Sequence, residues 1–159
     1  MSDSFIRPAT TDELPTLLTV LRRVIDRCYR PFLGDAAVEE YIGSGEADRE
    51  LEQHFGDCMV LEHNNRVEGF IVFLDDRVHL LVVDLERHRT GMGSQLLNYA
   101  ERMLFARGNA VIRLETFTGN QRAVKFFARR GWVETGRRKD ERGQPERIQM
   151  EKRAPGTQA

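Results

Sequence analysis

The feature that most constrains this chain lies in residues 82–97, where an apolar run stops at Asp84, crosses a basic segment and enters a helix through Gly91 and Gly93. Glycine allows backbone conformations and close approaches that a side chain would block. The first turn of the following helix has N–H groups without intrahelical acceptors and carries the positive end of the helix dipole. This pattern predicts a site for phosphate groups.

Two well-known phosphate-binding patterns do not fit this segment. The P-loop requires Lys and then Ser or Thr after its second glycine, but Ser94 and Gln95 follow Gly93. The dinucleotide fingerprint requires a small residue three positions after the second glycine, but Leu96 stands there. A Gly-x-Gly before a helix is also typical of a plain turn. A nucleotide-binding regulatory domain is therefore disfavoured, and the rest of the chain must decide between a plain turn and another phosphate ligand.

A second motif lies further along the chain. Ala110–Phe117 alternates between apolar and polar residues as a strand does. Asn120 is expected to cap a short helix over Gln121–Arg130, which Gly131 ends. Strand character resumes over Trp132–Arg138. The order is therefore glycine turn, helix, strand, short helix and strand.

Together the two motifs resemble the GNAT superfamily of acyl-CoA-dependent N-acetyltransferases, in its small bacterial single-domain branch. The matching residues of the second motif are Asn120, Ala123, Phe126, Phe127, Gly131 and Trp132. The segment from Phe5 to Thr10 also looks like the opening of this family. The resemblance covers about residues 5–152. It implies an α/β (α+β) fold with a mixed, mostly antiparallel sheet of about six to seven strands, about four flanking helices, and a splay between the fourth and fifth strands.

The remaining pattern predicts the other elements of this fold. Further strands are expected at Phe5–Arg7, Cys58–Leu61, Val67–Leu74, Val78–Val83 and Arg147–Lys152. Apolar residues from Leu14 to Cys28 have helical spacing, with Thr10, Thr11 or Asp12 as the cap. Asp35 is expected to cap a second short helix, and Ser94–Arg107 is expected to form the central helix. The polar segment Gly43–Gly56 predicts no more than a helical turn.

The resemblance also implies where acetyl-CoA, the co-substrate, binds. Backbone groups of Leu81, Val82 and Val83 would pair with the pantetheine arm, and the N–H of Val83 would polarise the thioester carbonyl. Asn120 and Phe127 would contact the cofactor. The pyrophosphate would lie on the turn formed by His88, Arg89, Thr90, Gly91, Met92, Gly93 and Ser94. His88 departs from the Gln or Arg that the family usually has at its position, but Arg89 retains a positive charge.

The reaction predicted by this resemblance needs a base, because only an unprotonated amine attacks a thioester. His79 on the strand before Asp84 and Glu115 on the strand before Asn120 both match bases used within the superfamily, and each is equally well explained as an ordinary strand residue. Phe127 stands where many relatives have a tyrosine that protonates the leaving thiolate. The sequence therefore predicts an acyl-CoA N-acyltransferase of the EC 2.3.1 type, with a non-catalytic acyl-CoA-binding module as the alternative.

Composition and length bound the remaining possibilities. The 159 residues, 40% hydrophobic and 31% charged, predict one soluble domain over residues 1–153 and a disordered tail over 154–159. The net charge of −1 argues against a nucleic-acid partner. No apolar run is long enough for a membrane span, and the first residues lack a signal peptide, so a cytoplasmic protein is expected. Its expected oligomeric state is a monomer or a homodimer. The four histidines have no metal-binding spacing, so no metal is expected.

The acceptor amine is the least constrained part of the prediction. In this fold the acceptor site is built by the first two helices and the final hairpin, here Tyr29, Arg30, Phe32, Tyr41 and residues 137–147. A small molecule or a protein amino terminus fits equally well. Cys28 and Cys58 lie outside both motifs, which favours direct transfer over an acetyl-cysteine intermediate.

Overall fold

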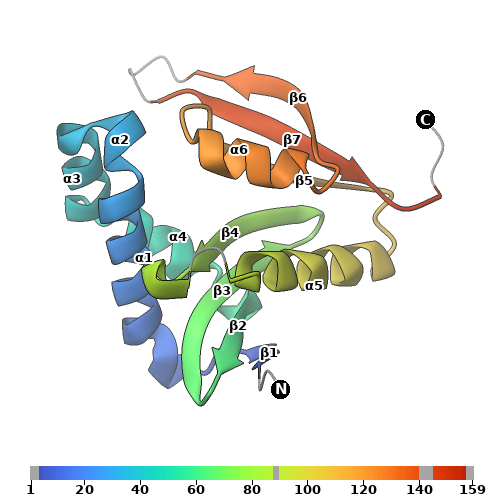
Figure 1. Ribbon diagram of the computed structural model, residues 1–159, viewed down its shortest axis with the longest axis horizontal. Helices are drawn as coiled ribbons and strands as arrows, with labels where there is room; N and C mark the ends of the chain where they lie inside the picture. Colours follow the sequence, from blue (N-terminus) through green and yellow to red (C-terminus); the bar gives the residue numbers. More distant parts are fainter. Residues whose placement is uncertain (1–3, 88–89, 140–144, 157–159) are drawn as a thin grey trace.

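The structure is a computed structural model that describes residues 4–87, 90–139 and 145–156. Seven strands form one sheet in the order β1-β2-β3-β4-β5-β7-β6 (Figure 1). Adjacent strands are antiparallel except for the parallel pair β4 and β5, which confirms the predicted mixed, mostly antiparallel sheet. The strands are β1 (Ser4–Pro8), β2 (Cys58–His63), β3 (Arg66–Leu74), β4 (Arg77–Val83), β5 (Val111–Phe117), β6 (Val133–Arg138) and β7 (Arg147–Arg153).

The described residues contain six α-helices, two more than the number expected. They are α1 (Leu14–Cys28), α2 (Arg30–Leu33), α3 (Asp35–Gly43), α4 (Glu46–Gln53), α5 (Met92–Ala106) and α6 (Gln121–Ala128). The additional elements are α2, whose Pro31 is tolerated in a first helical turn, and α4. In α4, Ala47 and Leu51 are four residues apart on one face, and both are fully buried. Tertiary burial of this face thus forms a helix from a segment that is otherwise polar.

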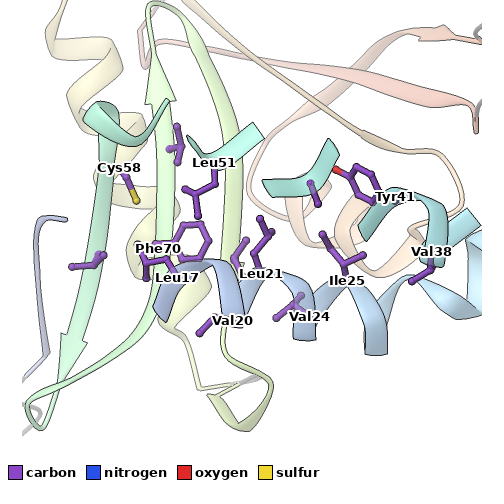
Figure 2. Packing of buried hydrophobic residues seen from close by; sticks show 14 of the residues in the cluster. Leu17, Val20, Leu21, Val24, Ile25, Val38, Tyr41, Leu51, Cys58 and Phe70 are labelled. Carbon is purple, nitrogen blue, oxygen red and sulfur yellow. The ribbon is translucent and has the colours of Figure 1, made fainter. Parts of the chain in front are cut away.

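Helices cover both faces of the sheet, and each face has its own hydrophobic core (Figure 1). The first core joins α1, α3 and α4 to Val60, Phe70, Val72, Val82 and Phe117. Figure 2 shows Leu17 and Leu21 of α1 near Phe70 and Leu51, and Ile25 of the same helix nearer Tyr41. The second core joins α5 and α6 to the opposite face. Neighbouring residues of β3 alternate between the two cores, because successive strand side chains point to opposite faces.

Of two helix starts near the amino terminus, one differs from the sequence prediction and one agrees with it. The predicted cap Asp35 is the first residue of α3, and Gly34, with a φ of 86°, is the N-cap. Glycine adopts this left-handed conformation without a steric penalty, so the chain can turn sharply out of α2. Thr10 is the cap at the start of the first helical segment, where the Glu13 carboxylate accepts the Thr10 N–H at 2.9 Å.

The parallel strands β4 and β5 separate soon after they meet. Only Arg77 with Arg113 and Val78 with Leu114 are paired, although both strands continue beyond these positions. Opposite β3, the register shifts so that Val72 pairs with Leu80 and Phe73 with Val78, which leaves His79 as the extra residue of a β-bulge. The predicted splay between the fourth and fifth strands is therefore confirmed, and it begins beside His79.

The first residue after β7 keeps a backbone contact with the rest of the fold. Ala154, the first residue of the predicted disordered tail, donates its N–H to the Ala110 carbonyl at 2.9 Å, and residues 157–159 lie outside the described part. Residues 140–144, which belong to the predicted acceptor segment 137–147, lie outside it as well. Within the described ranges, no helix is both long and apolar enough to cross a membrane.

Candidate active site

The start of α5 has the geometry predicted for a phosphate site. Gly91 has a φ of 85° and is the N-cap, so the helix begins at Met92, two residues earlier than expected from Ser94. The Gln95 N–H donates to the Gly91 carbonyl at 3.0 Å. The N–H groups of the residues before Gln95 have no acceptor within the helix. They point along the helix axis toward the glycine turn.

Three elements meet at the first turn of α5. A Cβ on Gly93 would make ordinary van der Waals contact with Phe126 Cζ at 3.5 Å and with Val83 Cγ2 at 3.8 Å, so the helix lies against α6 and the end of β4 here. The Arg130 guanidinium hydrogen-bonds to the Ser94 hydroxyl and lies 3.8 Å from the centre of the Phe126 ring. Arg130 therefore adds a positive charge beside the helix N-terminus.

Sequence reasoning did not single out Arg130. The sequence indicates a contact of Arg130 only through its spacing of four residues from Phe126. Residues four apart lie on the same face of a helical turn. The link to Ser94 is a tertiary contact between α6 and α5.

The donors around this turn fit the phosphates of coenzyme A. Backbone N–H groups, a hydroxyl and a guanidinium are suited to bind anionic oxygens, and the glycine turn leaves room for them. Thr90 donates its hydroxyl to the Arg87 carbonyl, and Arg87 pairs with the buried Glu68 at 3.2 Å. His88 and Arg89, also predicted for this cradle, lie outside the described residues. Their contact with the cofactor stays a prediction.

The strand residues predicted to hold the pantetheine arm are engaged in packing through their side chains. Val82 is 5% exposed in the first core, and Leu81 and Val83 pack against the second. Any contact of these residues with the cofactor would therefore use their backbone, as the sequence prediction assumed.

Replacing Gly91 with Val should abolish most of the increase in Tm that acetyl-CoA causes. A branched side chain in the left-handed region costs about 1–3 kcal/mol, so the turn would shift its N–H groups away from the phosphates. Gly108→Val is a matched control, because Gly108 has a φ of 98°, equally open surroundings and a position at the other end of α5. Both variants should lose stability, but only Gly91→Val should lose the ligand effect. An unchanged Tm increase in a folded Gly91→Val protein would contradict the phosphate assignment.

The two predicted cofactor residues on α6 have different surroundings. Asn120 caps the helix, as predicted, and its Oδ1 accepts the Ala123 N–H at 3.2 Å. Phe127 is only 7% exposed, and its ring has edge contacts with Phe126 and Trp132 at centroid distances of 5.3 Å and 6.0 Å. Phe127 is thus mainly a core residue, and its contact with the cofactor also stays a prediction.

On the other face of the splayed strands lies a cavity of about 190 Å³. It receives residues from α4, β4, β5 and β7, including both predicted bases. Its lining is Glu50, Gln53, His54, Arg77, Val78, His79, Leu80, Glu115 and Arg147. His79 and Glu115 follow the paired residues Val78 and Leu114, so both point away from the second core and into this cavity.

His79 occupies a position suited to a neutral imidazole. The bulge places it in the cavity, where its ring stacks on His54 with centroids 4.5 Å apart and an angle of 22°. Burial is the main cause that lowers the pKa of His79, and nearby His54 and Arg77 lower this pKa further. The imidazole is therefore uncharged at neutral pH and able to accept a proton.

Glu115 is held by hydrogen bonds from two side chains. Arg138 donates to its carboxylate at 2.7 Å and 3.3 Å, and Gln149 donates at 3.2 Å. Burial raises the pKa of Glu115, but these hydrogen bonds and the Arg138 charge outweigh it, so the pKa lies below its ordinary value. The carboxylate is thus a weaker proton acceptor than its position in the sequence suggested.

The residues predicted for the acceptor site lie in different surroundings, and their contact with an acceptor stays a prediction. Tyr29, Phe32 and Tyr41 surround the Phe117 ring, with centroid distances of 5.7 Å, 6.1 Å and 6.2 Å, and Tyr41 donates its hydroxyl to Glu50 at 2.9 Å. Arg30 instead pairs with Asp26 and Asp35 on the surface.

Four cavity residues, Glu50, His54, Arg77 and Arg147, were not identified as a group from the sequence. No local pattern connects them, because they come from α4, the residue that follows it, β4 and β7.

This arrangement of a glycine-capped helix beside splayed parallel strands matches known proteins. The sequence pattern of the acetyltransferase (GNAT) family matches residues 18–132. The chain belongs to the GNAT family. That family carries out acetyl transfer, which makes this chain an acetyltransferase in its general class.

Solved structures of GNAT proteins confirm the fold. A GCN5-related N-acetyltransferase from Rhodopseudomonas palustris superposes with a TM-score of 0.84 at 18% identity, covering 97% of this chain and 98% of its own. PaiA N-acetyltransferase from Thermoplasma acidophilum, solved with coenzyme A, gives 0.79 at 19% identity, with coverages of 96% and 99%. The ribosomal-protein-S18-alanine N-acetyltransferase from Escherichia coli gives 0.70 at 19% identity, with coverages of 98% and 99%. No curated protein sequence matches the chain significantly.

Metal-binding side chains do not gather in this GNAT fold as far as it is described. Within residues 4–87, 90–139 and 145–156, no group of three or more His, Cys, Asp or Glu side chains could hold an ion.

Proposed function

We propose that this chain transfers the acetyl group of acetyl-CoA directly to a primary amine of a small molecule or a protein amino terminus. The observation that carries the proposal is the position of His79, in a cavity at the point where β4 separates from β5. The phosphate-binding geometry at α5 supports acetyl-CoA as the donor, and so does the coenzyme A bound by the similar PaiA structure.

In the proposed reaction His79 accepts the proton that the amine must lose. An aliphatic ammonium has a pKa near ~10, so the attacking form is scarce at neutral pH unless a base is present. The neutral imidazole of His79 accepts this proton on a ring nitrogen, directly or through a water. His54, stacked on the ring, fixes its plane and opposes its protonation. Acetyl-CoA supplies the activated thioester: the C–N bond forms as the C–S bond breaks, and coenzyme A leaves as a thiolate that takes its proton from water.

Glu115 has a supporting part in this proposal. Its carboxylate is committed to Arg138 and Gln149, which ties β5 to β6 and β7 beside the cavity. In this proposal the Glu115 carboxylate places a negative charge beside the cavity and holds the three strands together, and it does not accept the proton of the amine.

The state of the two thiols supports direct transfer without an acetyl-cysteine. Cys58 is 2% exposed, and burial raises its pKa to about 12, so a thiolate does not form there at neutral pH. Burial also raises the pKa of Cys28, and neither cysteine lines the cavity.

A two-part experiment tests this function. Acetyl-CoA should raise the Tm by mass action, and release of coenzyme A should continue steadily when amines of several classes are supplied. A Tm increase with no turnover of any amine would instead support the alternative of a non-catalytic acyl-CoA-binding module. Absence of both effects would contradict the cofactor assignment itself.

A further inference from the structure

Two guanidinium groups in the cavity lack a hydrogen-bonded anionic partner. Within the described residues, the side chains of Arg77 and Arg147 form neither a hydrogen bond nor an ion pair, although both are half-buried. Arg147 lies over the Phe117 ring, with its guanidinium carbon 4.4 Å from the ring centre. This stacking holds the guanidinium in one orientation while leaving its N–H groups available.

The carboxylates in the same cavity are already engaged. Glu115 accepts hydrogen bonds from Arg138 and Gln149, and Glu50 accepts one from the Tyr41 hydroxyl. Burial raises the pKa of Glu50, which weakens its tendency to carry a full negative charge. The Arg147 charge also acts on both carboxylates and lowers their pKa, but no hydrogen bond joins it to either of them. The groups whose hydrogen-bonding capacity stays unused are therefore the two guanidinium groups. Because buried charges are stable only when paired, the cavity is complementary to an anion.

We propose that the acceptor is a small amine that also carries a carboxylate, in the simplest case a free amino acid. Arg147, assisted by Arg77, holds the carboxylate and so presents the amine to His79. A guanidinium matches a carboxylate through two parallel N–H donors. The volume of about 190 Å³ is below the range of roughly 300–1,000 Å³ for sites that take drug-sized ligands, which favours a small acceptor. This inference rests on the proposed acetyl transfer and names its substrate class.

Amino acids and their amides form matched substrate pairs for the test, because each pair differs only in the carboxylate. Coenzyme A release would be measured for wild type, Arg147→Gln and Arg147→Lys, with an aliphatic diamine as a third substrate class. Arg153→Gln is a matched control, since Arg153 is an exposed arginine at the far end of the same strand. The amide has the more readily deprotonated amine, so a preference for the acid would run against intrinsic reactivity.

We expect wild type to prefer the acids. Arg147→Gln should lower kcat/KM for the acids about 10- to 100-fold, the effect of one lost hydrogen bond to a charged group, and leave kcat/KM for the amides nearly unchanged. Arg147→Lys should retain part of the preference for the acids over their amides. Arg153→Gln should retain all of this preference. Equal use of acids and amides, a preference for the diamine, or an equal loss on both members of a pair would overturn the inference while acetyl transfer stands. Acetyl-CoA binding without turnover of any amine would overturn the proposed function and the inference together.

Discussion

Replacing His79 with Gln is expected to lower kcat/KM for the amine about 10²–10⁴-fold, the contribution typical of a general base. Gln can fill much of the space of the imidazole in the cavity but cannot accept a proton at neutral pH. Acetyl-CoA affinity, measured by the increase in Tm, should change little, because His79 lies apart from the turn at the start of α5. The measurement is steady-state release of coenzyme A.

The pH profile of kcat adds a second readout of His79. Its pKa in the folded protein is below the ordinary value of ~6.5, so the imidazole is neutral above that pH and becomes protonated only at lower pH. Wild-type kcat should therefore be at its maximum near pH 7 and should fall as the pH drops through this lowered pKa. The His79→Gln variant should lack that acidic limb.

Glu115→Gln and His54→Gln are the comparisons for the base assignment. Glu115→Gln should cost much less activity, because Gln can still accept the hydrogen bond from Arg138, and the carboxylate's lowered pKa already makes it a poor base. His54→Gln removes the stacked ring and should move the acidic limb to higher pH, since His54 lowers the pKa of His79. A loss in Glu115→Gln as large as that in His79→Gln would show that His79 is not the sole base.

Replacing Glu101 with Leu should reduce the free energy of unfolding by about 3–5 kcal/mol, because it breaks a buried charged network from one side. Glu101 is 7% exposed on α5 and accepts the indole N–H of Trp132 at 3.0 Å and the Lys152 ammonium at 2.6 Å. Leu would leave the Trp132 N–H buried without an acceptor. Urea unfolding at fixed pH measures the loss.

Two further variants separate the parts of this network. Glu101→Gln retains an acceptor for Trp132 and should lose less stability than Glu101→Leu. Arg102→Gln, at an exposed position one residue further along α5, should change stability by no more than about 0.5 kcal/mol. A Glu101→Leu protein as stable as Arg102→Gln would show that the network contributes nothing to stability.

The features predicted well from the sequence are those set by neighbouring residues. Gly91 as the entry to α5 and Asn120 as the cap of α6 follow from local backbone chemistry, and both are confirmed. The strands and long helices follow from hydrophobic periodicity, with boundaries moved by one or two residues. The short helices α2 and α4 escaped prediction because packing on the first core, rather than intrinsic propensity, stabilises them.

The sequence by itself determined the family resemblance, the glycine turn for phosphates and the two residues considered as bases. Only the tertiary structure decided that His79 and Glu115 share one cavity, because their proximity depends on the register of two parallel strands distant in the chain. The bulge at His79 arises from the pairing of β3 with β4. The hydrogen bonds that occupy Glu115 and the position of Arg147 arise from the pairing of β7 with β5 and β6. Local periodicity specifies the face of the sheet on which a side chain lies. Contacts between distant segments decide which groups surround that side chain, and these groups set its pKa and its chemistry.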